Sequence, residues 1–282
     1  MFRFFLILCL LLSSCAPRIT SAPDFNEDIA RAEQLYNAGD YANAQEAFTN
    51  ISDAAQGTDP YAQAEAMMFL GRIERSTGEP ERALHTLQQA RTLYEQLDDT
   101  LGVAHVLNSI GISYDYLTKT NEARAAFNEA LQLLKTIDDI KGQANTTMNL
   151  AILDLNEGVT KQAERGFLDA QTLFVQLEDV FESRLGQARV FSNLGTLEID
   201  RAELSRAYSY LLEALALLKL LDIPKEQADA YLALGRLELQ RGNLAQAQNL
   251  FETSLAIYES IDHSYLETAL YYLAYVEELR AK

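Results

Sequence analysis

The sequence predicts an all-α solenoid of stacked helix pairs, and two observations carry that prediction. The segment 121–139 has an apolar stripe at the 3.6-residue period of an amphipathic helix. The members of this stripe are Ala123, Phe127, Ala130, Leu131 and Leu134. A similar stripe, small residue first, starts at positions 83, 123, 163, 207 and 247, in steps of 40, 40, 44 and 40. A fixed period of this length is typical of helix pairs that bury their apolar faces against one another.

The helix that precedes each stripe carries a second repeated signal, a large apolar residue followed by a small one. A residue with little or no side chain at this point lets the two helices of a pair approach closely. The signal recurs at Leu70-Gly71, Ile110-Gly111, Leu150-Ala151, Leu194-Gly195 and Leu234-Gly235. The extra four residues of the 44-residue step lie near Val180–Ser183 and predict either a longer loop or one more helical turn.

The turns between the two helices of a pair also repeat. A glycine suits the left-handed backbone conformation that often ends a helix. Four predicted turns hold Gly39, Gly78, Gly158 and Gly242, and the other two hold Thr118 and Ala202 at the same place.

Together these residues resemble the pattern of the tetratricopeptide repeat (TPR) family, in a long form of about 40 residues that is similar to the repeats of kinesin light chains. The resemblance implies a right-handed α-solenoid over residues 24–282, with six helix pairs and a C-terminal capping helix at 265–282. It also implies that the first helix of each pair lines a concave inner wall.

The composition excludes several classes of function. The chain has 41 acidic and 23 basic residues and a net charge of −18, which disfavours nucleic-acid binding because phosphate contacts need clustered Lys and Arg. We find no metal-ligand, phosphate-loop or nucleophile motif, so we expect no metal, no cofactor and no enzymatic activity. The repeated acidic pairs Asp98-Asp99 and Asp138-Asp139 suit helix ends and turns better than a catalytic pair, which would need two unique acids.

The N-terminus predicts export. Phe4–Leu12 is apolar but rises only about 14 Å as a helix, too short to cross a bilayer, so residues 1–14 are expected to be a signal peptide. Leu12-Ser13-Ser14-Cys15 resembles the bacterial lipobox, which implies cleavage before Cys15, lipidation of Cys15 and a polar tether at 15–23. The location implied is the cell envelope, at the outer membrane facing the periplasm if the host has two membranes. The alternative is an ordinary secreted protein.

The inner wall is the candidate partner-binding site. Counted from the family pattern, its inward positions hold carboxamides near the centre, which suit the backbone of an extended peptide, and four of the few arginines, which suit acidic groups. The candidate residues are Arg72, Arg75, Asn108, Asn145, Asn149, Arg189, Asn193 and Arg236. In the long-repeat adaptors that the chain resembles, groove asparagines grip peptide backbone in this way.

The sequence therefore predicts a membrane-anchored scaffold or adaptor that binds a protein or peptide segment in its groove. Three alternatives remain open: a pilot or assembly factor of a secretion or pilus system, a regulator of a cell-wall enzyme, and an enzyme with a site that no motif reveals. Fold class alone does not choose among them.

Overall fold

The computed structural model describes residues 24–261 and 266–281, so the expectations for residues 1–23, including Cys15, lie outside the described residues. The described residues form thirteen α-helices, which confirms the all-α prediction. None of these helices combines the length and apolar character needed to span a bilayer. The helices are α1 Asn26–Asn37, α2 Tyr41–Ala55, α3 Pro60–Ser76, α4 Pro80–Gln96, α5 Thr100–Tyr116, α6 Thr120–Thr136, α7 Ile140–Asn156, α8 Thr160–Val175, α9 Val180–Asp200, α10 Leu204–Leu221, α11 Pro224–Gln240, α12 Leu244–Ser260 and α13 Leu266–Ala281.

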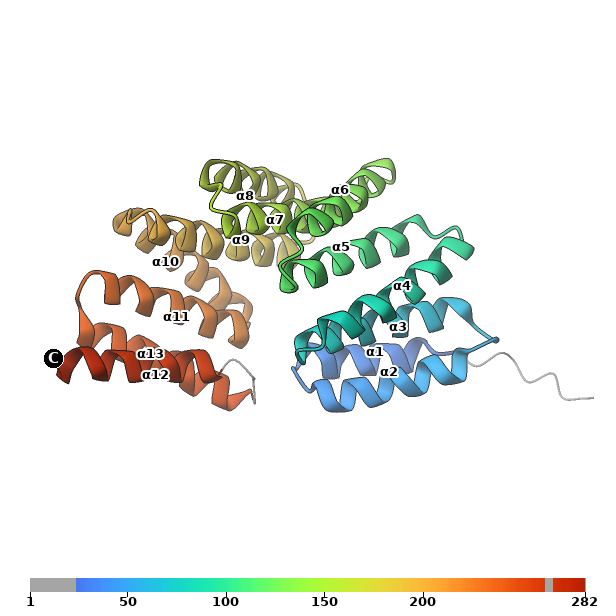
Figure 1. Cartoon of the computed structure of the whole chain (residues 1–282), viewed down its shortest axis with the longest axis horizontal. Coiled ribbons are helices and arrows are strands. Elements are labelled where there is room, and N and C mark those ends of the chain that lie inside the picture. The colour runs from blue at the N-terminus through green and yellow to red at the C-terminus, as the bar shows by residue number, and fades with distance from the viewer. Residues whose placement is uncertain (1–23, 262–265, 282) are drawn as a thin grey trace, which may run out of the picture.

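Successive helices pack as antiparallel pairs that stack into a curved solenoid (Figure 1). Successive odd-numbered helices from α1 to α11 also contact one another, and in Figure 1 α5, α7 and α9 lie inside the arc that α6, α8 and α10 form. The odd-numbered helices therefore line the inner wall. The two ends of the arc lie near each other, because the charge of Lys225 on α11 acts on Tyr41 on α2. Burial raises the pKa of Tyr41, and the ammonium group of Lys225 partly opposes that rise.

The seam inside each pair depends on residue size. A Cβ atom added to Gly111 would lie 2.6 Å from ring carbons of Phe127, and one added to Gly235 would lie 2.4 Å from the ring of Phe251. The fourth pair differs, because its first helix has Ala151. There the second helix carries Gly166, where an added Cβ would lie 2.8 Å from the Cβ of Ala151. In this pair the glycine therefore lies on the second helix instead of the first, and the two helices still approach closely.

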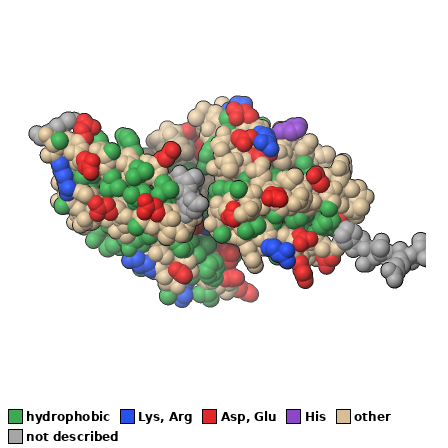
Figure 2. Space-filling view, turned by 90° about the horizontal axis from the view of Figure 1, so that it is seen from below, with side chains coloured by type: hydrophobic (Ala, Val, Ile, Leu, Met, Phe, Trp, Pro, Cys, Tyr) green, Lys and Arg blue, Asp and Glu red, His purple; other side chains and the backbone are tan. Residues whose placement is uncertain are grey.

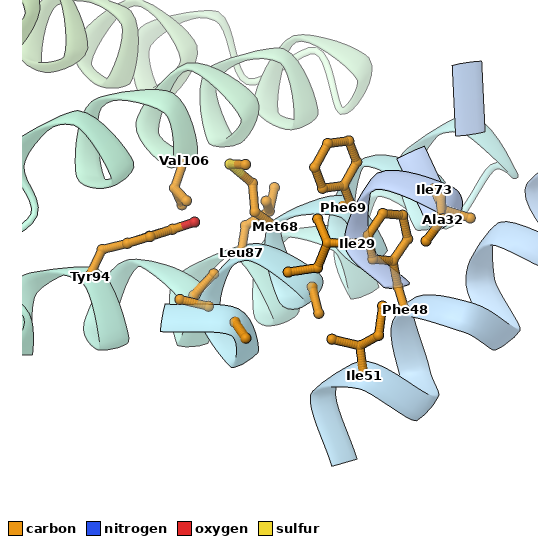
Figure 3. Packing of buried hydrophobic residues seen from close by; sticks show 14 of the residues in the cluster. Ile29, Ala32, Phe48, Ile51, Met68, Phe69, Ile73, Leu87, Tyr94 and Val106 are labelled. Carbon is orange, nitrogen blue, oxygen red and sulfur yellow. The ribbon is translucent and has the colours of Figure 1, made fainter. Parts of the chain in front are cut away.

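The core continues from pair to pair along the whole stack. At the N-terminal end, Phe48 of α2 stacks on Phe69 of α3 with ring centroids 4.7 Å apart, and Ile29, Ile51 and Ile73 surround them (Figure 3). Each pair alone would leave such a face in water, so burial of apolar area between pairs stabilises the array.

The turns inside each pair have the predicted left-handed conformation. Gly78 and Gly158 have φ of 88° and 75°, and Thr118 and Ala202 adopt φ of 56° and 61° at the same place despite their Cβ atoms. The four additional residues form one more helical turn, because α9 has 21 residues where α3, α5, α7 and α11 each have 17.

The repeated acidic pairs connect one helix pair to the next. Asp98 and Asp138 take left-handed φ values of 55° and 54°, and Asp99 and Asp139 accept hydrogen bonds from the backbone N–H of Gly102 and Gly142, at 3.0 and 3.1 Å. These carboxylates cap helix N-termini, as the sequence analysis favoured.

A row of buried acids near the ends of the inner helices is a feature that sequence analysis missed. Each acid forms an ion pair with at least one arginine, because a buried carboxylate without a partner is costly. The pairs are Glu74 with Arg82, Asp154 with Arg124, Glu198 with Arg201 and Arg206, and Glu238 with Arg241, at 2.8–3.3 Å.

Candidate partner-binding groove

The inner helices carry all eight of the predicted partner-binding residues, and each of these residues is half-buried. Half-burial fits a wall that is packed at its base and open toward the groove. By helix, the residues are Arg72 and Arg75 on α3, Asn108 on α5, Asn145 and Asn149 on α7, Arg189 and Asn193 on α9, and Arg236 on α11.

The centre of the groove presents carboxamides. Asn149 donates from Nδ2 to Oδ1 of Asn108 across neighbouring helix pairs, at 3.0 Å. Asn145 and Asn193 form no hydrogen bond through their side chains to any residue that the structure describes. A carboxamide has two donor hydrogens and an acceptor oxygen, so these four residues keep hydrogen-bonding capacity for an extended chain.

Asn145 also lines a cavity of about 380 Å³ between α5 and α7. His105 lies in this cavity, with Nε2 3.5 Å from Oδ2 of Asp139. Burial and the nearby charge of Arg72 lower the pKa of His105, and Asp139 partly opposes this shift. Leu101 and Ile137, both exposed, form the apolar part of the wall. The cavity therefore offers both apolar and polar contacts.

The arginines of the C-terminal half are paired within the chain. Nη2 of Arg189 lies 2.8 Å from Oε1 of Glu226, and Nη2 of Arg236 lies 3.9 Å from Oδ1 of Asp200. Both pairs join α9 to α11 across neighbouring repeats. In this structure they hold the inner wall together, and their charge is already partly neutralised.

The arginines of the N-terminal half differ, because neither forms an ion pair with a carboxylate among the described residues. Arg72 stacks over the ring of Phe69 at 5.0 Å and donates from Nε to Oγ of Ser109 at 3.2 Å. Burial lowers the pKa of Arg72, and the positive charge of Arg75 adds to that effect. Arg75 lies 6.0 Å over the ring of Tyr116, and its buried Nη1 has no acceptor within the described part of the chain.

An acidic residue lies close to these two guanidinium groups. Burial raises the pKa of Glu65, with Glu33 contributing, and the charge of Arg72 partly opposes the rise. Glu65 therefore interacts electrostatically with Arg72, although the two side chains do not lie within ion-pair distance. Among the described residues, no group of three or more His, Cys, Asp or Glu side chains is placed to hold a metal ion.

Sequence analysis did not find the partners across repeats. Arg72 and Ser109, and Arg189 and Glu226, are each 37 residues apart. The repeat period is 40 residues, so a residue 37 positions later lies on the next inner helix, about one helical turn before the equivalent position. A search for complementary residues at that offset would have found both pairs.

The architecture is that of a helical-repeat solenoid with an open concave face, and comparison with known proteins assigns its family. Models described as tetratricopeptide repeat match residues 28–96, 63–136 and 227–261, which together cover about half of the chain. The chain belongs to the tetratricopeptide repeat family. No curated protein matches its sequence.

Several solved structures are similar in fold. NprR in complex with its cognate peptide NprX has a TM-score of 0.70 and 15% identity, over 88% of this chain and 73% of that one. A Rap protein complexed with competence and sporulation factor has a TM-score of 0.67 and 12% identity, over 90% and 75%. BtubC from P. vanneervenii has a TM-score of 0.58 and 18% identity, over 85% and 93%. At these identities the similarity shows the fold.

Proposed function

We propose that this protein is a non-enzymatic adaptor that binds an extended segment of a partner protein along its concave groove. The segment's backbone is held by Asn108, Asn145, Asn149 and Asn193, and an acidic side chain or a terminal carboxylate is held by the N-terminal arginines.

The observation that carries this proposal is the pair Arg72 and Arg75. A buried N–H donor without an acceptor costs about 1–3 kcal/mol, and the buried Nη1 of Arg75 is such a donor as far as the described residues extend. A carboxylate from a ligand would satisfy it through a charge-assisted hydrogen bond. In a chain with a net charge of −18, two half-buried cations that have no carboxylate partner in the described part of the chain favour a binding site for an anionic group.

The related structures support a peptide or protein as the ligand. Two proteins with similar solenoids were solved with a bound peptide or factor, NprX in NprR and competence and sporulation factor in Rap. The open groove and its carboxamide-rich centre support an extended segment over a compact small molecule.

We further propose that the protein acts in the bacterial cell envelope, attached through lipid on Cys15. The support is in the sequence, where Leu12-Ser13-Ser14-Cys15 follows a short apolar segment. The lipobox resemblance implies a diacylglycerol group and an N-acyl chain on Cys15, and these three acyl chains would exceed the two signals that stable anchoring requires. The adaptor would then present its groove close to the membrane surface.

A crosslinked pull-down from the solubilised envelope of the native host tests the adaptor proposal. The full chain is compared with Arg72→Glu/Arg75→Glu in the groove and with Lys161→Glu/Arg165→Glu on α8, which makes the same change of charge on an even-numbered helix. We expect one envelope protein to be enriched by the parent and the α8 variant and lost with the groove variant. Retention of the same partner by the groove variant would contradict the proposed site.

A further inference from the structure

The last helix, α13, packs in the register of an inner helix. Its two buried residues are Ala269, which shares a cluster with Tyr258 of α12, and Val276, which shares a cluster with Phe251. The equivalent residues of α11, 39 positions earlier in the sequence, pack in the same way against α10. These residues are Ala230 and Leu237, against Leu218 and Leu211.

This register identifies the face of α13 that lacks a second helix. In α11 the equivalent face is covered by α12, with Gly235 against Phe251 and the carbonyl of Ala228 accepting a hydrogen bond from Ser254 at 2.8 Å. Their counterparts on α13, 39 residues later, are Ala274 and Glu267, and both are exposed.

Large apolar side chains accompany this face. Leu270 is 51% exposed, and Tyr271 and Tyr275 are 64% and 40% exposed, with their rings stacked at 6.4 Å. Figure 2 shows hydrophobic side chains gathered on the end of the solenoid that carries α12 and α13, with acidic side chains among them. A cluster of this kind on a soluble surface marks an interaction site.

The acidic residues at the two ends of this face indicate the charge of the helix that would cover it. Glu277 stands 39 residues after Glu238, at the position of the buried acids. In two repeats that acid is bound by an arginine at the third residue of the covering helix: Arg82 with Glu74 at 3.1 Å, and Arg206 with Glu198 at 3.3 Å. Glu267 lies at the other end of the face, about 15 Å away at the helical rise of 1.5 Å per residue.

We propose that this face, defined by Glu267, Leu270, Ala274 and Glu277, binds an amphipathic helix of a partner protein. The partner helix runs antiparallel to α13, like each second helix in the stack. At its centre the partner helix carries two small residues with a Leu or Phe between them. One basic residue near each end of that helix pairs with Glu277 or Glu267. The proposal is independent of the groove.

The same charges oppose a second copy of this chain as the occupant. In an antiparallel contact of two α13 helices, Glu267 would face Glu277 of the partner copy. In a parallel contact each acid would face itself. Like charges directly opposed across an interface are destabilising in both cases.

A charge-swap binding experiment tests the proposal. The probe is a labelled peptide with the sequence of α12, Leu244–Ser260, that carries Gln246→Arg and Tyr258→Lys. The matched peptide carries Gln246→Glu and Tyr258→Glu instead. Binding of each peptide to the full chain and to Glu267→Lys/Glu277→Lys is measured by fluorescence anisotropy.

We expect the basic peptide to bind the parent chain at least tenfold more tightly than the acidic peptide, and the charge-reversed chain to invert that preference. Leu270→Asp should weaken binding of the basic peptide at least tenfold, whereas Leu220→Asp, at an exposed site on α10, should not change it. Equal binding of the two peptides, or retention of binding by Leu270→Asp, would overturn the proposal. So would sedimentation showing that the chain dimerises through this face. The groove variant Arg72→Glu/Arg75→Glu should bind the basic peptide like the parent, which separates this test from that of the adaptor function.

Discussion

Replacement of Gly111 by alanine isolates the packing rule on which the solenoid depends. The added Cβ would lie 2.6 Å from Cδ1 and Cε1 of Phe127, whose ring is 2% exposed. Carbon atoms pack best at about 3.5–4.0 Å, so the ring or the helix has to move by about 1 Å. Such overpacking costs about 1–3 kcal/mol, and replacing glycine inside a helix recovers about 1 kcal/mol. The central values of these two effects give a net loss of about 1 kcal/mol in the free energy of unfolding.

The fourth pair supplies the matched rescue. It holds Ala151 and Gly166, 15 residues apart, where the third pair holds Gly111 and Ala126. The double variant Gly111→Ala/Ala126→Gly therefore copies a combination that the chain already uses. Although Ala126→Gly alone should cost about 1 kcal/mol of helix propensity, we expect the double variant to be about 1 kcal/mol more stable than the sum of the single changes predicts.

Urea unfolding followed by circular dichroism measures all three variants against the parent chain. A Gly111→Ala variant as stable as the parent would refute the argument that the missing side chain permits the close approach. Simple additivity in the double variant would refute the argument that Gly166 compensates for Ala151.

Three further predictions concern turns, pH and the anchor. Thr118→Gly should relieve the left-handed strain at φ 56° and raise the free energy of unfolding by about 0.5 kcal/mol, whereas Thr118→Ala should give no gain in the same urea experiment. The pKa of His105 is lowered in the folded state, so its contribution to stability is present above the unfolded pKa of about 6.5 and is lost as pH falls below it. His105→Gln should flatten the part of the profile of melting temperature against pH that lies below about pH 6.5, and an unchanged slope there would count against the assignment. Cys15→Ser should abolish incorporation of labelled fatty acid and release the protein from the membrane fraction; persistent labelling would exclude Cys15 as the anchor.

The repeat architecture could be predicted because it depends on residue size at fixed intervals. Gly71, Gly111, Gly195 and Gly235 all lie where an added Cβ would collide with the facing helix, so sequence spacing reports directly on packing. The turn positions were predictable because glycine, which four of the six turns hold, suits the left-handed backbone conformation that ends a helix. At Val180–Ser183 the sequence was compatible with either a longer loop or one more helical turn, because it does not specify whether the helix begins before or after the four inserted residues. In the structure Asp179 caps α9 by accepting hydrogen bonds from Phe181 and Glu182, so the insertion becomes part of that helix.

The contacts across repeats in the groove could not be predicted from local pattern. The sequence placed Arg189 and Arg236 on the inner wall, but whether their charge meets a carboxylate depends on the shift between neighbouring inner helices. The structure pairs Arg189 with Glu226 and Arg236 with Asp200, and within its described residues it leaves Arg72 and Arg75 without a carboxylate partner. This difference narrows the expected anion-binding part of the groove to α3.

Site-specific photocrosslinking in the native host tests the central claim most directly, namely that the concave groove holds a partner segment. A photoreactive amino acid is placed at Asn145 or Asn193 in the groove and, as controls, at Gln162 on α8 or Glu213 on α10. The account predicts a crosslinked adduct with a single partner protein from the groove positions, lost when Arg72→Glu/Arg75→Glu is added, and none from the controls. Adducts from the control positions alone would contradict it.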